Sequence, residues 1–138
     1  MNTKDLIERL YTISQLILQD DTDLEAIDNL LEERDDDSFA TQWMNEYNAI
    51  EEFKQETEYD SLIDTCREKI FKTVYNKTKS PDLSSYICDD FTLFMEALTC
   101  EYESMWLNAL LLEYKQGKIP KGNITEQKGT LATLILEL

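Results

Sequence analysis

Residues 60–76 read DSLIDTCREKIFKTVYN, and apolar side chains recur along them every three or four positions, at Ile63, Cys66, Ile70 and Val74. This spacing places the four side chains on one face of an α-helix, whereas Arg67, Lys69 and Lys72 fall on other faces. The stretch contains no glycine or proline, the two residue types that most often interrupt a helix. It therefore predicts a long amphipathic helix that turns one face toward a hydrophobic core.

Three further helices are predicted before this stretch, over residues 4–18, 22–34 and 38–58, because apolar residues recur at helical spacing in each. A capping box that begins at Thr22 opens the second helix. Ser38 is the expected N-cap of the third. The third helix is predicted to bury a face that contains Trp43, Tyr47, Ile50 and Phe53.

The chain has 3 glycines and 2 prolines, and four of these five residues lie between residues 117 and 129. The stretch from residue 77 to residue 116 therefore contains few helix breakers. The pair Ser80-Pro81 has the form of an N-cap followed by proline in the first helical position. Two more helical faces follow, the first made of Phe91, Phe94, Met95 and Leu98 and the second of Met105, Trp106, Ala109, Leu110 and Leu112. Gly117 is expected to end the second of these helices, and residues 118–124 to form a loop.

The tail after residue 130 has apolar residues at helical spacing, with a short strand as the alternative. Together these patterns predict an all-α fold. We expect a single domain over residues 1–138, built as an irregular bundle of about six or seven helices.

The charge of the chain is strongly negative and unevenly distributed. There are 13 Lys and Arg against 29 Asp and Glu, a formal net charge of −16, and residues 20–64 hold 17 of the acids but only Arg34 and Lys54 as bases. Such an excess opposes direct binding to nucleic acid or to an anionic membrane. It favours a basic protein partner.

Acidic residues also recur at spacings of four, at Glu52, Glu56, Asp60 and Asp64, which destabilises a continuous helix. A binding surface would explain the retention of this pattern, and a solvated helix face is the alternative. The predicted contacts are Asp35, Asp36, Asp37, Glu52, Glu56, Glu58, Tyr59 and Asp60, with Asp20, Asp21 and Asp23 as a second patch. Tyr59 and Tyr102 are equally compatible with an interface and with the core, whereas Tyr47 is expected in the core.

Catalytic chemistry finds little support in the composition. The chain has no histidine, the commonest general base, and its 3 glycines cannot form a phosphate-binding loop. We therefore expect no catalytic residue, metal or cofactor. A carboxylate-metal nucleotide pyrophosphohydrolase remains an alternative, although Gln55 occupies the fifth position of its E-E-x-x-E pattern. No apolar run is long enough to span a bilayer, and no signal peptide is evident, so we expect a cytoplasmic protein.

Three strings between residues 85 and 122, SYICDDFTLFMEAL, WLNAL and YKQGKIPKG, resemble the carboxy-terminal half of small helical immunity proteins. Such proteins are encoded beside bacterial contact-dependent-inhibition and other polymorphic toxins. The resemblance implies a cytoplasmic, non-catalytic protein that binds one cognate toxin domain, frequently a basic nuclease, and occludes its active site. It assigns no residue roles.

Two other readings stay open beside this one. A nucleic-acid-mimicking anti-restriction or anti-CRISPR protein would carry acids at phosphate-like intervals along an elongated face. An immunity protein would instead gather them in a compact patch with an aromatic centre. An adaptor or regulatory subunit cannot be distinguished from an inhibitor by sequence.

Overall fold

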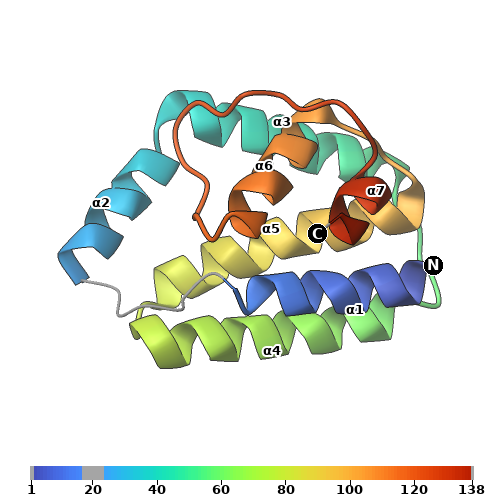
Figure 1. Cartoon of the computed structure of the whole chain (residues 1–138), viewed down its shortest axis with the longest axis horizontal. Helices are drawn as coiled ribbons and strands as arrows, with labels where there is room; N and C mark the ends of the chain where they lie inside the picture. The colour runs from blue at the N-terminus through green and yellow to red at the C-terminus, as the bar shows by residue number, and fades with distance from the viewer. Residues whose placement is uncertain (1, 17–23, 138) are drawn as a thin grey trace.

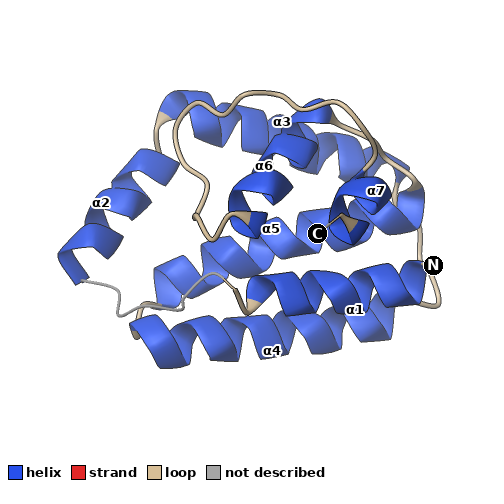
Figure 2. Ribbon diagram, in the orientation of Figure 1, coloured by secondary structure: helices blue, strands red, loops and turns tan. Residues whose placement is uncertain are grey.

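The structure, a computed structural model, describes residues 2–16 and 24–137. Those residues contain seven helices and no strand (Figure 1 and Figure 2). The helices are α1 (Thr3–Ser14), α2 (Leu24–Arg34), α3 (Asp37–Phe53), α4 (Asp60–Thr78), α5 (Pro81–Cys100), α6 (Met105–Lys115) and α7 (Leu131–Leu136). The predicted all-α bundle of six or seven helices is confirmed, and the tail forms helix α7 rather than a strand.

Helix α5 lies at the centre of the bundle and packs against α1, α2, α3, α4 and α7. It begins as predicted, because the Ser80 hydroxyl accepts a hydrogen bond from the Leu83 amide at 3.1 Å and Pro81 takes the first turn. Phe91 and Phe94 are both 0% exposed. Buried side chains on several sides of α5 allow neighbouring helices to cover it all round.

Helices α1 and α4 lie side by side along one edge of the bundle (Figure 1). The predicted face of α4 is buried against α5 and α1: Ile63, Cys66, Ile70 and Val74. Helix α3 lies along the opposite edge in Figure 1, with α2 at one end. The connection from α3 to α4 runs down the side of the molecule near the N-terminus (Figure 1).

The segment between α6 and α7 runs across the bundle as an irregular connection (Figure 2). Gly117 follows α6 with φ of 79°, a left-handed conformation that closes the helix as predicted. Asn108 of α6 anchors the other end, because its side-chain amide donates to the carbonyls of Gln127 and Gly129 at 3.1 and 2.9 Å. The predicted loop over residues 118–124 is confirmed.

Three predicted helix boundaries are wrong: the end of α1 and both ends of α3. Helix α1 ends at Ser14 rather than residue 18, and the proposed second acidic patch, Asp20, Asp21 and Asp23, lies outside the described residues together with Thr22. Helix α3 begins at Asp37 with Asp36 in the N-cap position, so Ser38 lies inside the helix.

Helix α3 also ends at Phe53 instead of continuing to residue 58. Lys54 is extended, with ψ of 146°, and its ammonium group binds Glu51 at 2.7 Å and Glu96 of α5 at 3.2 Å. Beyond it the Asp60 carboxylate accepts hydrogen bonds from the Thr57 amide at 3.3 Å and hydroxyl at 3.1 Å. These bonds start a new helix, so the break is stabilised from both sides.

The buried face of α3 differs from the prediction as well. Tyr47 is 38% exposed and Phe53 is 59% exposed, and neither belongs to the core. Phe39 and Glu46 join Ile50 inside instead. The reason is tertiary: α3 packs mainly against α5 and α2, so a residue in phase with the core is buried only where a neighbouring helix covers it.

Candidate functional site

The predicted acidic contacts form two clusters at the two ends of α3. We name Asp35, Asp36 and Asp37 the acidic corner, between α2 and α3, and Glu52, Glu56, Glu58 and Asp60 the acidic loop, between α3 and α4. All seven side chains are exposed. Their separation along the 17-residue helix is about 24 Å, from a rise of about 1.5 Å per residue. The structure therefore does not gather them into one compact patch.

None of these seven carboxylates forms an ion pair with a described residue. The exposed bases that form ion pairs do so with other acids: Lys72 pairs with Glu68, and Lys121 pairs with Glu33. Because α3 ends at Phe53, Glu52 and Glu56 share no helix with Asp60. The repulsion expected from a continuous acidic line is therefore reduced to the pair Asp60 and Asp64 within α4.

Apolar groups are exposed on α3 itself, and the sequence reasoning did not identify them as surface. Met44 is 45% exposed, and Tyr47 stacks on Trp43 with ring centroids 5.6 Å apart. Tyr59, the predicted aromatic centre of the patch, is only partly exposed and packs against the core. The aromatic surface thus lies along α3, between the two clusters, rather than within the acidic loop.

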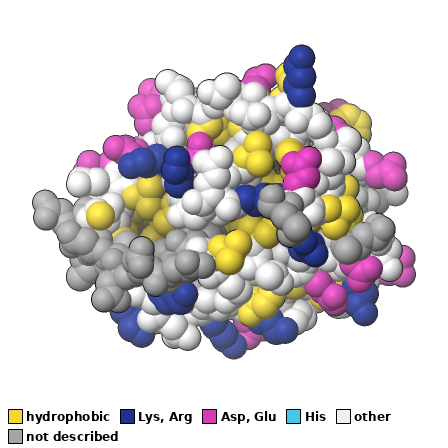
Figure 3. Space-filling model, in the orientation of Figure 1, with side chains coloured by type: hydrophobic (Ala, Val, Ile, Leu, Met, Phe, Trp, Pro, Cys, Tyr) yellow, Lys and Arg dark blue, Asp and Glu magenta, His cyan; other side chains and the backbone are white. Residues whose placement is uncertain are grey.

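Acidic residues also occur outside these clusters. On the face shown in Figure 3, Asp and Glu occur at the outline and within the face, and several Lys and Arg lie along the lower edge. That edge corresponds to α4 (Figure 1), whose bases include Arg67, Lys69 and Lys72. Other exposed acids, such as Asp5 and Asp82, also form no ion pair with a described residue. What distinguishes the corner and the loop is thus their position at the two ends of α3.

A buried ion pair anchors the acidic corner. Arg34, the last residue of α2, contacts Asp90 of α5 through two hydrogen bonds of 2.6 and 2.8 Å, and the side chains are 5% and 0% exposed. The indole Nε1 of Trp43 donates to the same carboxylate at 2.9 Å, and the Tyr114 hydroxyl donates to it as well. The Arg34 guanidinium also donates to the Pro120 carbonyl at 3.2 Å. One carboxylate therefore joins α2, α3, α5 and α6.

The electrostatics of this network follow from burial and from Asp90. Burial alone would lower the pKa of Arg34, but the attraction and hydrogen bonds of Asp90 outweigh it and raise the pKa. Burial, and then Asp90, raise the pKa of Tyr114 well above its ordinary range. Arg34 therefore stays charged and Tyr114 stays a hydrogen-bond donor.

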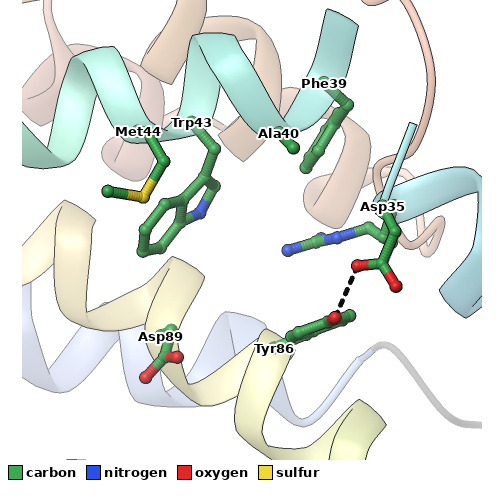
Figure 4. A pocket seen from close by; sticks show the side chains of 8 residues that line it. Asp35, Phe39, Ala40, Trp43, Met44, Tyr86 and Asp89 are labelled. Carbon is green, nitrogen blue, oxygen red and sulfur yellow. Dashed lines mark hydrogen bonds between the residues drawn. The ribbon is translucent and has the colours of Figure 1, made fainter. Parts of the chain in front are cut away.

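A hollow of about 170 Å³ opens beside this network, between α3 and α5 (Figure 4). Its lining consists of Arg34, Asp35, Phe39, Ala40, Trp43, Met44, Tyr86 and Asp89. The Arg34 guanidinium carbon lies 4.5 Å from the Phe39 ring centre and 5.3 Å from that of Tyr86. The Tyr86 hydroxyl donates to Asp35 at 2.6 Å, which attaches the acidic corner to the hollow. We name this feature the α3–α5 hollow.

Comparison with known families gives a match to the family described as Immunity protein PIM1 over residues 4–121. The chain belongs to this family of immunity proteins. The matched residues include both acidic clusters and the whole α3–α5 hollow. A search of curated proteins finds no match. The resemblance to immunity proteins of toxin systems is thereby confirmed, and an immunity-type function follows from membership of the family.

One of the alternative readings requires a metal site. Residues 2–16 and 24–137 contain no group of three or more His, Cys, Asp or Glu placed to hold a metal ion, whereas the pyrophosphohydrolase alternative requires four converging acids. In the same part of the chain, no helix is both long and apolar enough to cross a membrane.

A second buried carboxylate holds α3 to the junction of α5 and α6. Glu46 is 5% exposed and accepts hydrogen bonds from the Tyr102 hydroxyl at 2.6 Å, from Ser104 at 2.8 Å and from Gln42 at 3.2 Å. Tyr102, which the sequence left open between interface and core, thus has a structural role. Burial, and then the hydrogen bond to Glu46, raise the pKa of Tyr102 to about 12.

Substitution Tyr102→Phe is expected to destabilise the protein by about 1–2 kcal/mol near neutral pH, because Glu46 loses its shortest hydrogen bond. The difference from wild type should shrink as pH rises from 10 to 12. The unfolded chain releases the Tyr102 proton near pH 10 and the folded chain only near pH 12, so the stabilisation present below pH 10 is lost across that interval. Urea unfolding of both proteins at several pH values measures this, and a difference that stays constant to pH 12 contradicts it.

Proposed function

We propose that this immunity protein neutralises a basic toxin domain, a nuclease, by binding it along α3 and covering its active-site cleft. The observation that supports the proposal is the set of seven exposed carboxylates without ion pairs among the described residues, placed at both ends of one helix. Unpaired exposed acids attract a cationic surface, and in a nuclease cleft they would occupy the positions of substrate phosphates.

The distance between the clusters suits a single partner. A standard interface buries about 800 Å² on each side, which corresponds to a patch about 30 Å across. The acidic corner and the acidic loop, about 24 Å apart along α3, both fit within such a patch. The exposed Met44 and Tyr47 lie between them and would supply apolar contact near its centre.

The middle of α3 favours a protein partner over mimicry of nucleic acid. Between the clusters the exposed positions of α3 are mainly neutral, including Thr41, Asn45 and Asn48. A mimic would need carboxylates there at phosphate-like intervals. Acids at the ends with neutral and apolar groups between them instead suit a protein surface with separate basic patches.

The proposed location is the cytoplasm, where a nuclease toxin would meet its substrate. The proposed mode of action is inhibition by occlusion, without catalysis. Both statements rest on the family membership and on the acidic surface.

The test uses the toxin domain encoded by the neighbouring reading frame. A triple variant, Glu52→Gln, Glu56→Gln and Glu58→Gln, removes three charges from the acidic loop. At about 1 kcal/mol for each charge, binding is expected to weaken about 100-fold. Isothermal titration calorimetry measures the affinity, and a nuclease assay on plasmid DNA and total RNA measures inhibition.

A matched control removes three exposed acids from other parts of the surface: Asp5→Asn, Glu8→Gln and Glu126→Gln. These acids lie on α1 and on the connection between α6 and α7. The control is expected to weaken binding no more than about threefold, through the change in net charge alone. Equal losses in both triple variants would contradict the proposed surface, and a toxin without nuclease activity would contradict the proposed target.

A further inference from the structure

The α3–α5 hollow has features of a receptor for a single side chain. Its volume of about 170 Å³ can hold one long side chain. It is too small for a helix, which is about 10 Å across. Figure 4 shows Trp43 and Met44 on α3 facing Tyr86 and Asp89 on α5, with Asp35 at the end near α2. The hollow thus combines aromatic and apolar walls with a carboxylate at two separate points of its lining.

We propose that the α3–α5 hollow receives one arginine side chain of the toxin, with its guanidinium group between Asp35 and Asp89 and its stem against Trp43 and Met44. This inference rests on the proposed function, because it names one contact within the interface along α3. It adds a defined recognition site to an interface otherwise described only by its charge.

The charges around the hollow favour a cation. Arg34 is part of the lining, but its charge is matched by the buried Asp90 at 2.6 Å. Asp89 lies 3.6 Å from Arg67, a long and half-exposed contact. Asp35 accepts a hydrogen bond from Tyr86 but forms no ion pair with any described residue. The lining therefore keeps a net negative charge.

The partial burial of Asp89 also favours a cation in the hollow. Burial raises the pKa of Asp89 despite the nearby Arg67, so the charge of this carboxylate is only partly compensated in the protein alone. A guanidinium group brought into the hollow would complete that compensation. Arginine suits the site because its planar head can bind carboxylates and stack on aromatic rings at once.

The structure already contains the proposed contact in an intramolecular form. The Arg34 guanidinium lies over Phe39 and near Tyr86 while Asp90 binds it through two hydrogen bonds. The same kind of walls, aromatic rings beside a carboxylate, line the adjacent hollow. A second guanidinium in the hollow would face Trp43 and Tyr86 in place of Phe39.

The first test fills the hollow with a cation from the chain itself. Met44→Arg places a guanidinium at the mouth, where Met44 is 45% exposed and its replacement leaves the core intact. Asn48→Arg is the matched control, because it adds the same charge to exposed α3 one turn away and outside the lining. We expect Met44→Arg to weaken toxin binding at least tenfold more than Asn48→Arg, and equal losses would overturn the inference. Circular dichroism confirms that both variants fold.

The second test needs no toxin. Nuclear magnetic resonance follows the indole N–H signal of Trp43 while Nα-acetyl-arginine amide is added, with the buried Trp106 as internal reference. A saturable shift with a dissociation constant on the order of 1–10 mM is expected for the wild type and not for Met44→Arg. The absence of a shift would overturn the inference, as would an equal shift with the uncharged Nα-acetyl-norleucine amide, which would show a general apolar site. An equal shift with the lysine amide would overturn the preference for arginine.

These outcomes separate the two proposals. If the acidic-loop variant weakens toxin binding while Met44→Arg matches its control, the α3–α5 hollow is not a contact and the interface along α3 stands. If the arginine amide binds the hollow but neither the acidic-loop variant nor Met44→Arg weakens toxin binding, the proposed function fails. The proposed recognition of a toxin arginine then fails with it.

Discussion

Replacement of Asp90 by alanine is expected to lower the free energy of unfolding by about 3–5 kcal/mol. Asp90 is 0% exposed and is the only described carboxylate within ion-pairing distance of the buried Arg34. Its loss leaves a guanidinium group in the interior without a countercharge. Trp43 and Tyr114 also lose their acceptor. Urea unfolding followed by circular dichroism measures the change.

The neighbouring residue supplies the control for this prediction. Asp89 pairs with Arg67 at 3.6 Å, and the two side chains are 47% and 44% exposed, so Asp89→Ala should cost less than about 1 kcal/mol. A double variant, Arg34→Met with Asp90→Leu, should recover part of the stability because neither charge remains buried. If Asp90→Ala is as stable as Asp89→Ala, the ion pair does not hold α2 and α5 together.

The association rate of the toxin should fall on the order of 10- to 1000-fold as salt is added from low to high concentration. The screening length shortens from about 30 Å at about 0.01 M to about 3 Å at about 1 M ionic strength. Seven exposed carboxylates without ion pairs to described residues then no longer attract a basic partner over distance. Stopped-flow fluorescence at several salt concentrations measures the rate.

The stability of the immunity protein alone provides the control, because salt screens the mutual repulsion within a chain of net charge −16 and should not unfold it. The acidic-loop variant should show a shallower salt dependence than wild type. An association rate that is indifferent to salt would argue against electrostatic docking, even if the complex were tight.

The parts of the fold that the sequence predicted are those specified by local spacing. The face of α4 that begins at Ile63, the cap at Ser80 and the closing glycine at Gly117 each depend on residues only a few positions apart. Helical periodicity and capping are local physics, so these features could be identified without the tertiary structure.

Some of the errors arose where a distant element contributes to the outcome. The end of α3 at Phe53 depends on Lys54 reaching Glu96 of α5, 42 positions away, although Thr57 and Asp60 did carry a local signal for a new helix that the sequence reasoning missed. Tyr47 was expected in the core because of its phase, but it is 38% exposed and stacks on Trp43 at the surface of α3.

The sequence by itself determined that this protein is helical, that its charge is strongly negative and that 17 of its 29 acids lie in residues 20–64. Only the tertiary structure decided that seven of those acids form two clusters at the ends of one helix, that Arg34 is buried against Asp90, and that a hollow opens between α3 and α5. The physical reason is the distance along the sequence over which each kind of interaction acts. Helix formation depends on neighbours within about one turn, whereas Arg34 and Asp90 are 56 positions apart and meet only when the packed helices bring them together.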